Sequence, residues 1–203
     1  RCGRPAICGF SDFPSLPFFV GTKVAKFDYL CTNEETLNLI YVMMSQQERA
    51  EIIALIKREV IPAIGCTEPI AVALCTARAA EALGCRPERL EVLLSANILK
   101  NAMGVGIPGT GMIGLPIAVA LGALIGRSEY QLEVLRDVTP EAVAEGRRFI
   151  DEKRISIALK EGIEEKLYIE VHALGGGHVA TAVIAGGHTS FVYVERDGAV
   201  ELD

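Results

Sequence analysis

Residues 66–84 read CTEPIAVALCTARAAEALG, a stretch that carries the start and stop signals of one complete helix. Thr67 is the expected N-cap, Pro69 falls in the first turn, where a missing backbone amide costs little, and Gly84 supplies the stop. We therefore predict a helix over about residues 68–83. Its alanine-rich body favours close packing against other helices, because the interaxial distance depends on the side chains at the contact.

A helix is also expected before this one, and a strand after it. Ser45 and Glu48 form an S-x-x-E capping box, apolar residues follow at helical spacing, and Pro62 ends that helix. After the central helix, LEVLLSA at 90–96 is typical of a short strand. A glycine-rich segment and the apolar helix LPIAVALGALIG follow at 97–126.

The pattern changes from helix to strand in the last quarter of the chain. Thr139 and Pro140 are typical of an N-cap and a first helical position, and this helix should end near Phe149. Four segments with strand character follow, separated by glycine turns, and they predict an antiparallel sheet of about four strands. Helices followed by strands indicate an α+β fold. The four segments are RISIALK (154–160), KLYIEVHA (166–173), HVATAVIA (178–185) and HTSFVYVE (188–195).

These patterns divide the chain into three parts. Because the capping box begins directly after Met43 and Met44, we interpret residues 1–43 as a doubtful leader translated from upstream sequence. Residues 44–150 form a helical part with the cysteine motif and the glycine-rich loop. Residues 151–203 form the antiparallel β part, which we expect to be truncated at its C-terminus.

Composition excludes several classes of function. The net charge of −6, with no stripe of lysine and arginine, argues against nucleic-acid binding. Six irregularly spaced cysteines do not form a secreted disulfide pattern, so we expect a cytoplasmic protein. Residues 101–126 carry no charge, but their seven glycines and two prolines argue against a membrane span.

The glycine-rich loop contains GTGMIG at 109–114, which matches the dinucleotide-binding pattern G-x-G-x-x-G. Pro108 cannot donate to a central strand ladder, and no βαβ unit follows, so a nicotinamide-dependent oxidoreductase is only an alternative. Lys100, Asn101 and Thr110 bracket the loop with a cation, an amide and a hydroxyl, which together suit a small carboxylate. The other interpretation is that the glycines only allow tight helix packing.

Cys66 precedes the central helix, where partial positive charge and unpaired amides stabilise a thiolate. It is therefore a candidate nucleophile or metal ligand, with small-residue packing as the alternative. Cys75 lies nine residues on and should project from the opposite face. His172 and His178 flank a triple-glycine turn, and we interpret them as surface residues at strand ends, with a zinc site, if a hairpin brings them together, as the alternative. His188 is the histidine most expected to face a pocket.

Three motifs, in order, resemble the iron–sulfur L-cysteine desulfidase family, which is related to the alpha chains of iron–sulfur-dependent L-serine dehydratases. They are PAIGCTEPIAVAL (62–74), SANILKNAMGVGIPGTGMIG (95–114) and GGHVATAVIAGGHTSF (176–191). The resemblance covers about residues 45–200. It implies a lyase that uses a [4Fe–4S] cluster for α,β-elimination from L-cysteine or L-serine. The products are pyruvate, ammonia, and sulfide or water.

The resemblance also implies roles for individual residues. Cys66 is the expected cluster ligand, one of three cysteines in the family, whose fourth iron site is left for substrate. Ser190 stands where the family has asparagine after the histidine–threonine pair. The remaining assignments are catalytic roles for Lys100, Asn101 and His188, and substrate contacts for Thr67, Ser95, Asn97 and Thr110.

The chain departs from this family chiefly in length. The family's other cluster cysteines lie in a C-terminal portion that has no counterpart before Asp203. We therefore expect this chain to be the first part of an enzyme and to be inactive alone. The expected partners are a small amino-acid substrate and either further copies of the chain or a missing C-terminal half or partner chain. A third interpretation is a non-catalytic domain completed by a partner chain.

Overall fold

A computed structural model describes residues 45–60 and 62–202, and the expected leader at 1–43 lies outside them. Two compact units divide between Glu59 and Val60, and each is described by itself. The first contributes α3 (Gln46–Glu59). Its capping box is confirmed, because the Glu48 amide donates to Ser45 Oγ at 3.1 Å and the Ser45 amide donates to Glu48 Oε2 at 2.8 Å.

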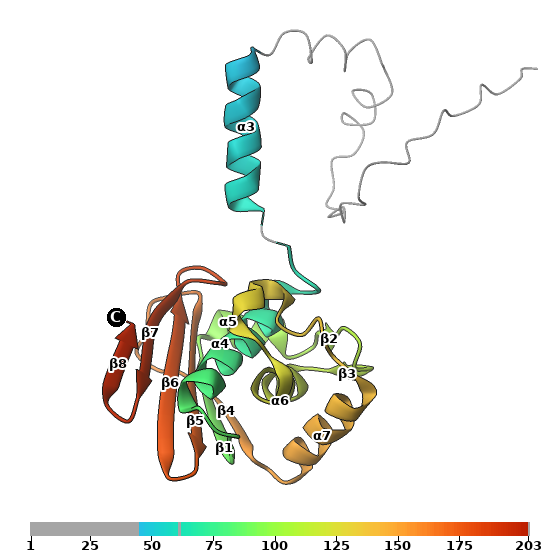
Figure 1. Ribbon diagram of the computed structural model, residues 1–203, viewed down its shortest axis with the longest axis vertical. Helices are drawn as coiled ribbons and strands as arrows, with labels where there is room; N and C mark the ends of the chain where they lie inside the picture. The colour runs from blue at the N-terminus through green and yellow to red at the C-terminus, as the bar shows by residue number, and fades with distance from the viewer. Residues whose placement is uncertain (1–44, 61, 203) are drawn as a thin grey trace, which may run out of the picture. The chain divides into compact units, whose positions relative to one another are not determined.

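The second unit is a sheet with helices packed on one of its faces (Figure 1). None of the helices in the described part of the chain is long and apolar enough to cross a membrane. The helices are α4 (Thr67–Leu83), α5 (Ala96–Ala102), α6 (Leu115–Ile125), the 3-10 helix η2 (Ser128–Glu133) and α7 (Pro140–Asp151). The strands are β1 (Arg89–Leu94), β2 (Gly106–Ile107), β3 (Met112–Ile113), β4 (Ile155–Leu159), β5 (Tyr168–Gly175), β6 (His178–Ala185), β7 (Phe191–Arg196) and β8 (Ala199–Leu202).

The main sheet has six strands in the order β4-β1-β5-β6-β7-β8. The α+β class is confirmed, and the sheet is mostly antiparallel as predicted, but it is mixed because one pair of strands is parallel. Strand β1, from the helical part, lies between β4 and β5, and it runs parallel to β4 with Leu90 beside Ile155. Parallel neighbours need a long crossover connection, which here contains α5, α6 and α7. The sequence prediction also missed β8, the hairpin of β2 and β3, and α5.

Helix α4 is the centre of the core. It packs on β5, β6 and β7 and beside α6, while α7 packs on α6 (Figure 1). The approach of α4 and α6 is very close, because a Cβ added at Gly122 would lie 2.4 Å from the Ala73 carbonyl oxygen. Cys75 is fully buried against the sheet, with its Sγ 3.2 Å from the Ala182 carbonyl oxygen. Burial raises the pKa of the Cys75 thiol, which therefore stays protonated.

Candidate functional site

Cys66, the glycine-rich second motif and the β6–β7 turn of the third motif lie at one end of the second unit, whereas the third motif begins at the opposite end, where Gly176 lies near Cys85. The C-terminal end of α4 lies beside the end of β7, because a Cβ added at Gly84 would be 3.0 Å from Arg196 Nη1. The N-terminus of α4 therefore lies at the opposite end, where β7 begins. At that end β1 passes into α5, and the β6–β7 turn (186–190) is tied to the start of β5 by the Gly186 amide, which donates to the Leu167 carbonyl oxygen. We call this the motif end (Figure 1).

Cys66 is the N-cap residue of α4, is exposed, and makes no side-chain capping hydrogen bond. The first motif contacts the second here, because a Cβ added at Gly65 would lie 2.9 Å from Pro108 Cγ. The Ile64 amide donates to the Leu132 carbonyl oxygen at 3.2 Å, which fixes the loop that leads to Cys66. An exposed thiol at a helix N-terminus, against a glycine-rich hairpin, is suited to act as a thiolate ligand or nucleophile.

Thr67 is not the N-cap, so that prediction is wrong. The helix begins at Thr67 itself, and the Thr67 hydroxyl donates to Glu68 Oε2 at 3.2 Å instead of accepting from a backbone amide. The predicted end of the helix is confirmed. Gly84 adopts a left-handed conformation with φ 73°, and its amide donates to the carbonyl oxygens of the last turn.

Two predicted substrate contacts are occupied by local hydrogen bonds. The Ser95 hydroxyl donates to the Lys166 carbonyl oxygen at 2.8 Å and accepts from the Tyr168 amide at 3.3 Å, and Ser95 is only 3% exposed. The Thr110 hydroxyl donates to the Ile107 carbonyl oxygen at 2.7 Å within the β2–β3 hairpin. A substrate that used either hydroxyl would have to replace these bonds. Their substrate roles stay predictions, and both residues hold the backbone of the motif end.

The other predicted residues of the motif end are more accessible. Lys100 and Asn101 are exposed on α5, and Asn97, at the start of α5, is exposed as well. Asn97 lines a pocket of about 480 Å³ between α5 and the loop 159–166. His188 is half-buried in the β6–β7 turn. It lies in this turn and not in a strand, because β7 begins only at Phe191.

The β5–β6 hairpin does not pair His172 with His178, which argues against the zinc alternative. Strand register pairs His172 with Thr181, and the two side chains lie 2.9 Å apart (Nδ1 to Oγ1). His178 pairs instead with Gly175, and its Nδ1 lies 2.7 Å from Asp197 Oδ2. Within residues 45–60 and 62–202, no group of three or more histidine, cysteine, aspartate or glutamate side chains could hold a metal ion.

The same geometry limits what the described residues can do for a cofactor. The thiol of Cys75 faces the sheet, and Cys85 lies beyond the far end of α4. Among the described cysteines, Cys66 alone offers a thiol at the motif end. The described residues therefore do not fit a complete [4Fe–4S] cluster. The segment 109–114 folds into the β2–β3 hairpin and the N-cap of α6, so it does not form the strand–turn–helix of a dinucleotide site.

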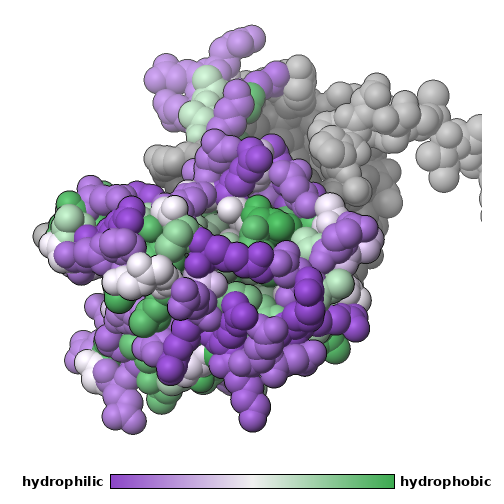
Figure 2. All heavy atoms as spheres, turned by 60° about the horizontal axis from the view of Figure 1, so that its bottom comes forward, coloured by the Kyte–Doolittle hydropathy of each residue, from purple (hydrophilic) through white to green (hydrophobic). Residues whose placement is uncertain are grey.

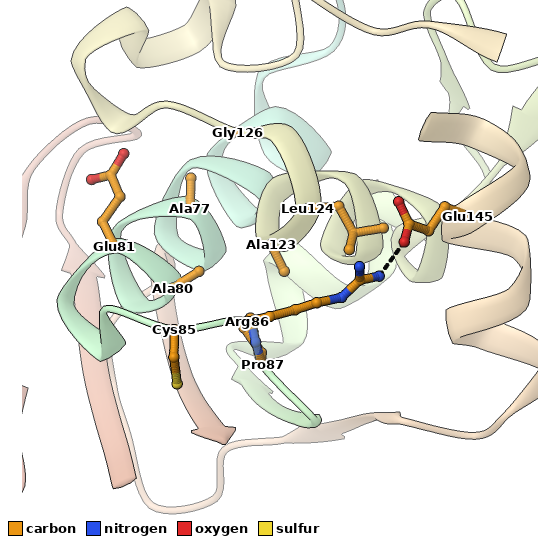
Figure 3. A pocket seen from close by; sticks show the side chains of 10 residues that line it. All are labelled: Ala77, Ala80, Glu81, Cys85, Arg86, Pro87, Ala123, Leu124, Gly126 and Glu145. Atoms are coloured by element: carbon orange, nitrogen blue, oxygen red, sulfur yellow. Dashed lines mark hydrogen bonds and ion pairs between the residues drawn. The ribbon is translucent and has the colours of Figure 1, made fainter. Parts of the chain in front are cut away.

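A second pocket, of about 330 Å³, lies near the C-terminal end of α4 and was not predicted from the sequence. In Figure 3, Arg86 extends across it to pair with Glu145, while small side chains of α4 and α6 form its floor. The exposed Cys85 lies at its edge. Figure 2 brings the bottom of Figure 1 forward, and the surface of the second unit seen there is mostly hydrophilic, with small hydrophobic patches.

Sequence reasoning also missed a polar cluster around Glu170, which is only 8% exposed. Glu170 Oε2 accepts from Lys160 Nζ at 2.6 Å and from the Tyr168 hydroxyl at 2.7 Å, and Oε1 lies 2.8 Å from His172 Nε2. Burial alone would raise the pKa of Glu170, but its hydrogen bonds and the charge of Lys160 outweigh this and lower it. Burial and the Glu170 carboxylate raise the pKa of the Tyr168 phenol, so Tyr168 stays a donor.

The lowered pKa of Glu170 predicts a specific dependence of stability on pH. The carboxylate contributes stability above its ordinary pKa of 4.5, and this contribution is lost as the pH falls through the lower pKa of the folded state. Glu170→Gln should cost about 2 kcal/mol at neutral pH, because Lys160 and His172 lose a charged acceptor. The free energy of unfolding of the Glu170→Gln variant should also fall less on acidification than that of the parent protein. Urea unfolding of both proteins between neutral pH and pH 3 measures this, and parallel curves would contradict it.

Comparison of the sequence with known proteins identifies homologues of this chain. No family model matches the chain. It is 73% identical over 160 residues to a protein of Bacteroides fragilis and 75% identical over 160 residues to one of Bacteroides thetaiotaomicron. It is 44% identical over 146 residues to one of Photobacterium profundum. These close homologues are named UPF0597 proteins.

The UPF0597 name states no activity. The matches cover 79% of this chain for the two Bacteroides proteins and 72% for the Photobacterium protein. The chain itself spans only 37% of the length of the Bacteroides proteins and 34% of the Photobacterium protein. Neither the name nor the matched segment assigns an activity to these longer UPF0597 proteins.

Proposed function

We propose that this chain is part of an iron–sulfur-dependent lyase that acts on L-cysteine or L-serine. In this reaction the α C–H bond and the β C–S or C–O bond break, and sulfide or water leaves. Water then hydrolyses the resulting enamine, through its imine tautomer, to pyruvate and ammonia. The proposal rests on the resemblance of three motifs to the desulfidase family and on one structural observation. The observation is that Cys66, in the first motif, is exposed at a helix N-terminus that packs against the glycine-rich second motif.

The physical chemistry of the motif end supports this assignment. The N-terminus of α4 carries partial positive charge, which attracts a substrate carboxylate. Lys100 and Asn101 are exposed on α5 and are the side chains that we propose bind this carboxylate. A bound cluster, with Cys66 as one of its ligands, would supply a Lewis-acidic iron. Because the described residues supply one thiolate, we assign the other ligands to the part of the protein outside the matched segment.

The test is an anaerobic assay of a protein of full UPF0597 length. The Bacteroides thetaiotaomicron relative and a chimera in which this chain supplies the matched segment are purified without oxygen and mixed with L-cysteine or L-serine. We expect both proteins to form pyruvate and ammonia from at least one of the two amino acids, and the 203-residue chain alone to form none. Failure of both full-length proteins would overturn the proposed function. Activity of the relative without activity of the chimera would overturn its assignment to this chain.

A further inference from the structure

The main sheet has a second face that points away from α4 and α6. Side chains alternate between the two faces along each strand, so Ile169 and Val171 face the core and Glu170 faces away. Strand register places Leu93, Glu170, Val183 and Tyr193 side by side on four neighbouring strands. We call this row, together with Tyr168 and His172 on the same side of β5, the open face.

The charges on the open face are already compensated. Glu170 is held by Lys160, Tyr168 and His172, and the Tyr193 hydroxyl donates to Glu195 Oε2 at 2.6 Å. These groups therefore need little water, and covering them leaves no charge without a partner. The row from Leu93 to Tyr193 therefore differs from an ordinary solvated sheet face, and the exposed charges beside it on β1 belong to the Arg89–Glu91 pair.

The centre of the open face combines apolar and aromatic side chains with the paired carboxylate of Glu170. Val183 is only 7% exposed and Glu170 only 8%, because neighbouring side chains on β5 and β7 shield them. Leu93, Tyr168 and Tyr193 are half-buried around them. Tyrosine at the centre and few free charges are typical of interface cores. Six strands about 4.8 Å apart and about 20 Å long give a face of about 500 Å², comparable to one side of a contact between domains.

The UPF0597 relatives have further polypeptide that is available to cover this face. The chain spans only 37% of the length of its Bacteroides relatives, so most of each relative lies outside the matched segment. A second copy of the chain is less suited. Two copies could stack their open faces about a two-fold axis that runs along the strands between β5 and β6. Strand β1 of one copy would then lie over β7 of the other. That arrangement brings Glu91 opposite Glu195, because register places both at the level of His172 and Thr181.

We propose that the open face is the docking surface for the part of the UPF0597 polypeptide outside the matched segment, which covers it with an apolar surface of its own. Docking buries the row from Leu93 to Tyr193 and closes the sheet between two layers, as in other layered domains. This proposal does not depend on the lyase activity.

The test is complementation between two polypeptides. The 203-residue chain, with an affinity tag, is co-expressed with the remaining part of the Bacteroides thetaiotaomicron relative, and the complex is measured by co-purification and titration calorimetry. Val183→Lys and Tyr193→Lys place a charge at the centre of the open face. Ala144→Lys is the matched control, because Ala144 is exposed on α7, which packs on α6 away from the sheet.

We expect a one-to-one complex whose dissociation constant rises at least 10-fold in both open-face variants and not in the control, with circular dichroism showing that each variant is folded. If Val183→Lys misfolds, Tyr193→Lys and the hydrogen exchange of β5–β7 in the wild-type complex test the proposal instead. Absence of a complex would overturn the proposal, as would equal affinity of the open-face variants and the control. A chain that dimerises alone and becomes monomeric in Tyr193→Lys would assign the face to a second copy instead.

Discussion

Serine in place of Cys66 is expected to abolish most of the pyruvate formation by the full-length chimera. Removing groups that only support a metal ligand typically costs about 10- to 100-fold, so loss of the proposed ligand itself should cost at least about 100-fold. Serine keeps the size of the side chain but replaces the sulfur, which is the ligand atom that iron–sulfur clusters use, with a hydroxyl oxygen. The measurement is the anaerobic rate of pyruvate formation, together with the iron content of each protein.

Cys85→Ser is the matched control for this variant. Cys85 is exposed like Cys66 but lies beyond the opposite end of α4, beside the second pocket. This control should keep the parent rate and the parent iron content. A Cys66→Ser protein that retains both would show that Cys66 has no role in the site, and its exposure at the helix N-terminus would then have only a structural meaning.

Among substitutions that add a single methyl group to the core, Gly122→Ala is expected to cause the largest loss of stability. The new Cβ would lie 2.4 Å from the Ala73 carbonyl oxygen and 3.0 Å from Ala73 Cα, which belong to the backbone of α4 and cannot rotate away. Alanine would gain about 1 kcal/mol of helix propensity, but the overpacking costs more, so we expect a net loss of about 3 kcal/mol. This corresponds to a fall in Tm of about 10 °C.

Thermal unfolding of the 203-residue chain measures this effect, with Gly104→Ala as the control. Gly104 has nothing within 4 Å of an added Cβ, so the same substitution there should leave Tm nearly unchanged. Equal values of Tm for the two variants would mean that α4 and α6 do not pack as closely as the structure shows.

Local signals in the sequence predicted the helices well and the sheet only in part. The capping box of α3 and the left-handed Gly84 are decided by neighbouring residues, so both predictions are confirmed. The pairing of β1 with β4 joins residues about 65 positions apart, and no local pattern specifies such a contact. Helix α5, with seven residues, is too short to show a helical period.

The candidate site was predictable where position along the chain decides the chemistry. The position of Cys66 at a helix N-terminus follows from the start signals of the helix, and the projection of Cys75 from the opposite face follows from helical spacing, whereas the exposure of the first and the burial of the second come from the fold. The hydrogen bonds of Ser95 and Thr110 do not, because their partners depend on how the loops fold. The Glu170 cluster did have a signal. Tyr168, Glu170 and His172 alternate along β5, which places three polar side chains on one face of a strand.

The central claim is that Cys66 and the motif end belong to an iron–sulfur lyase site. Its most direct test is electron paramagnetic resonance and iron analysis of the anaerobically purified chimera, before and after addition of L-cysteine. We predict about four iron atoms per polypeptide and a signal of the reduced cluster that changes when L-cysteine binds. A folded chimera without iron, or with a cluster signal that neither L-cysteine nor L-serine changes, would contradict the claim.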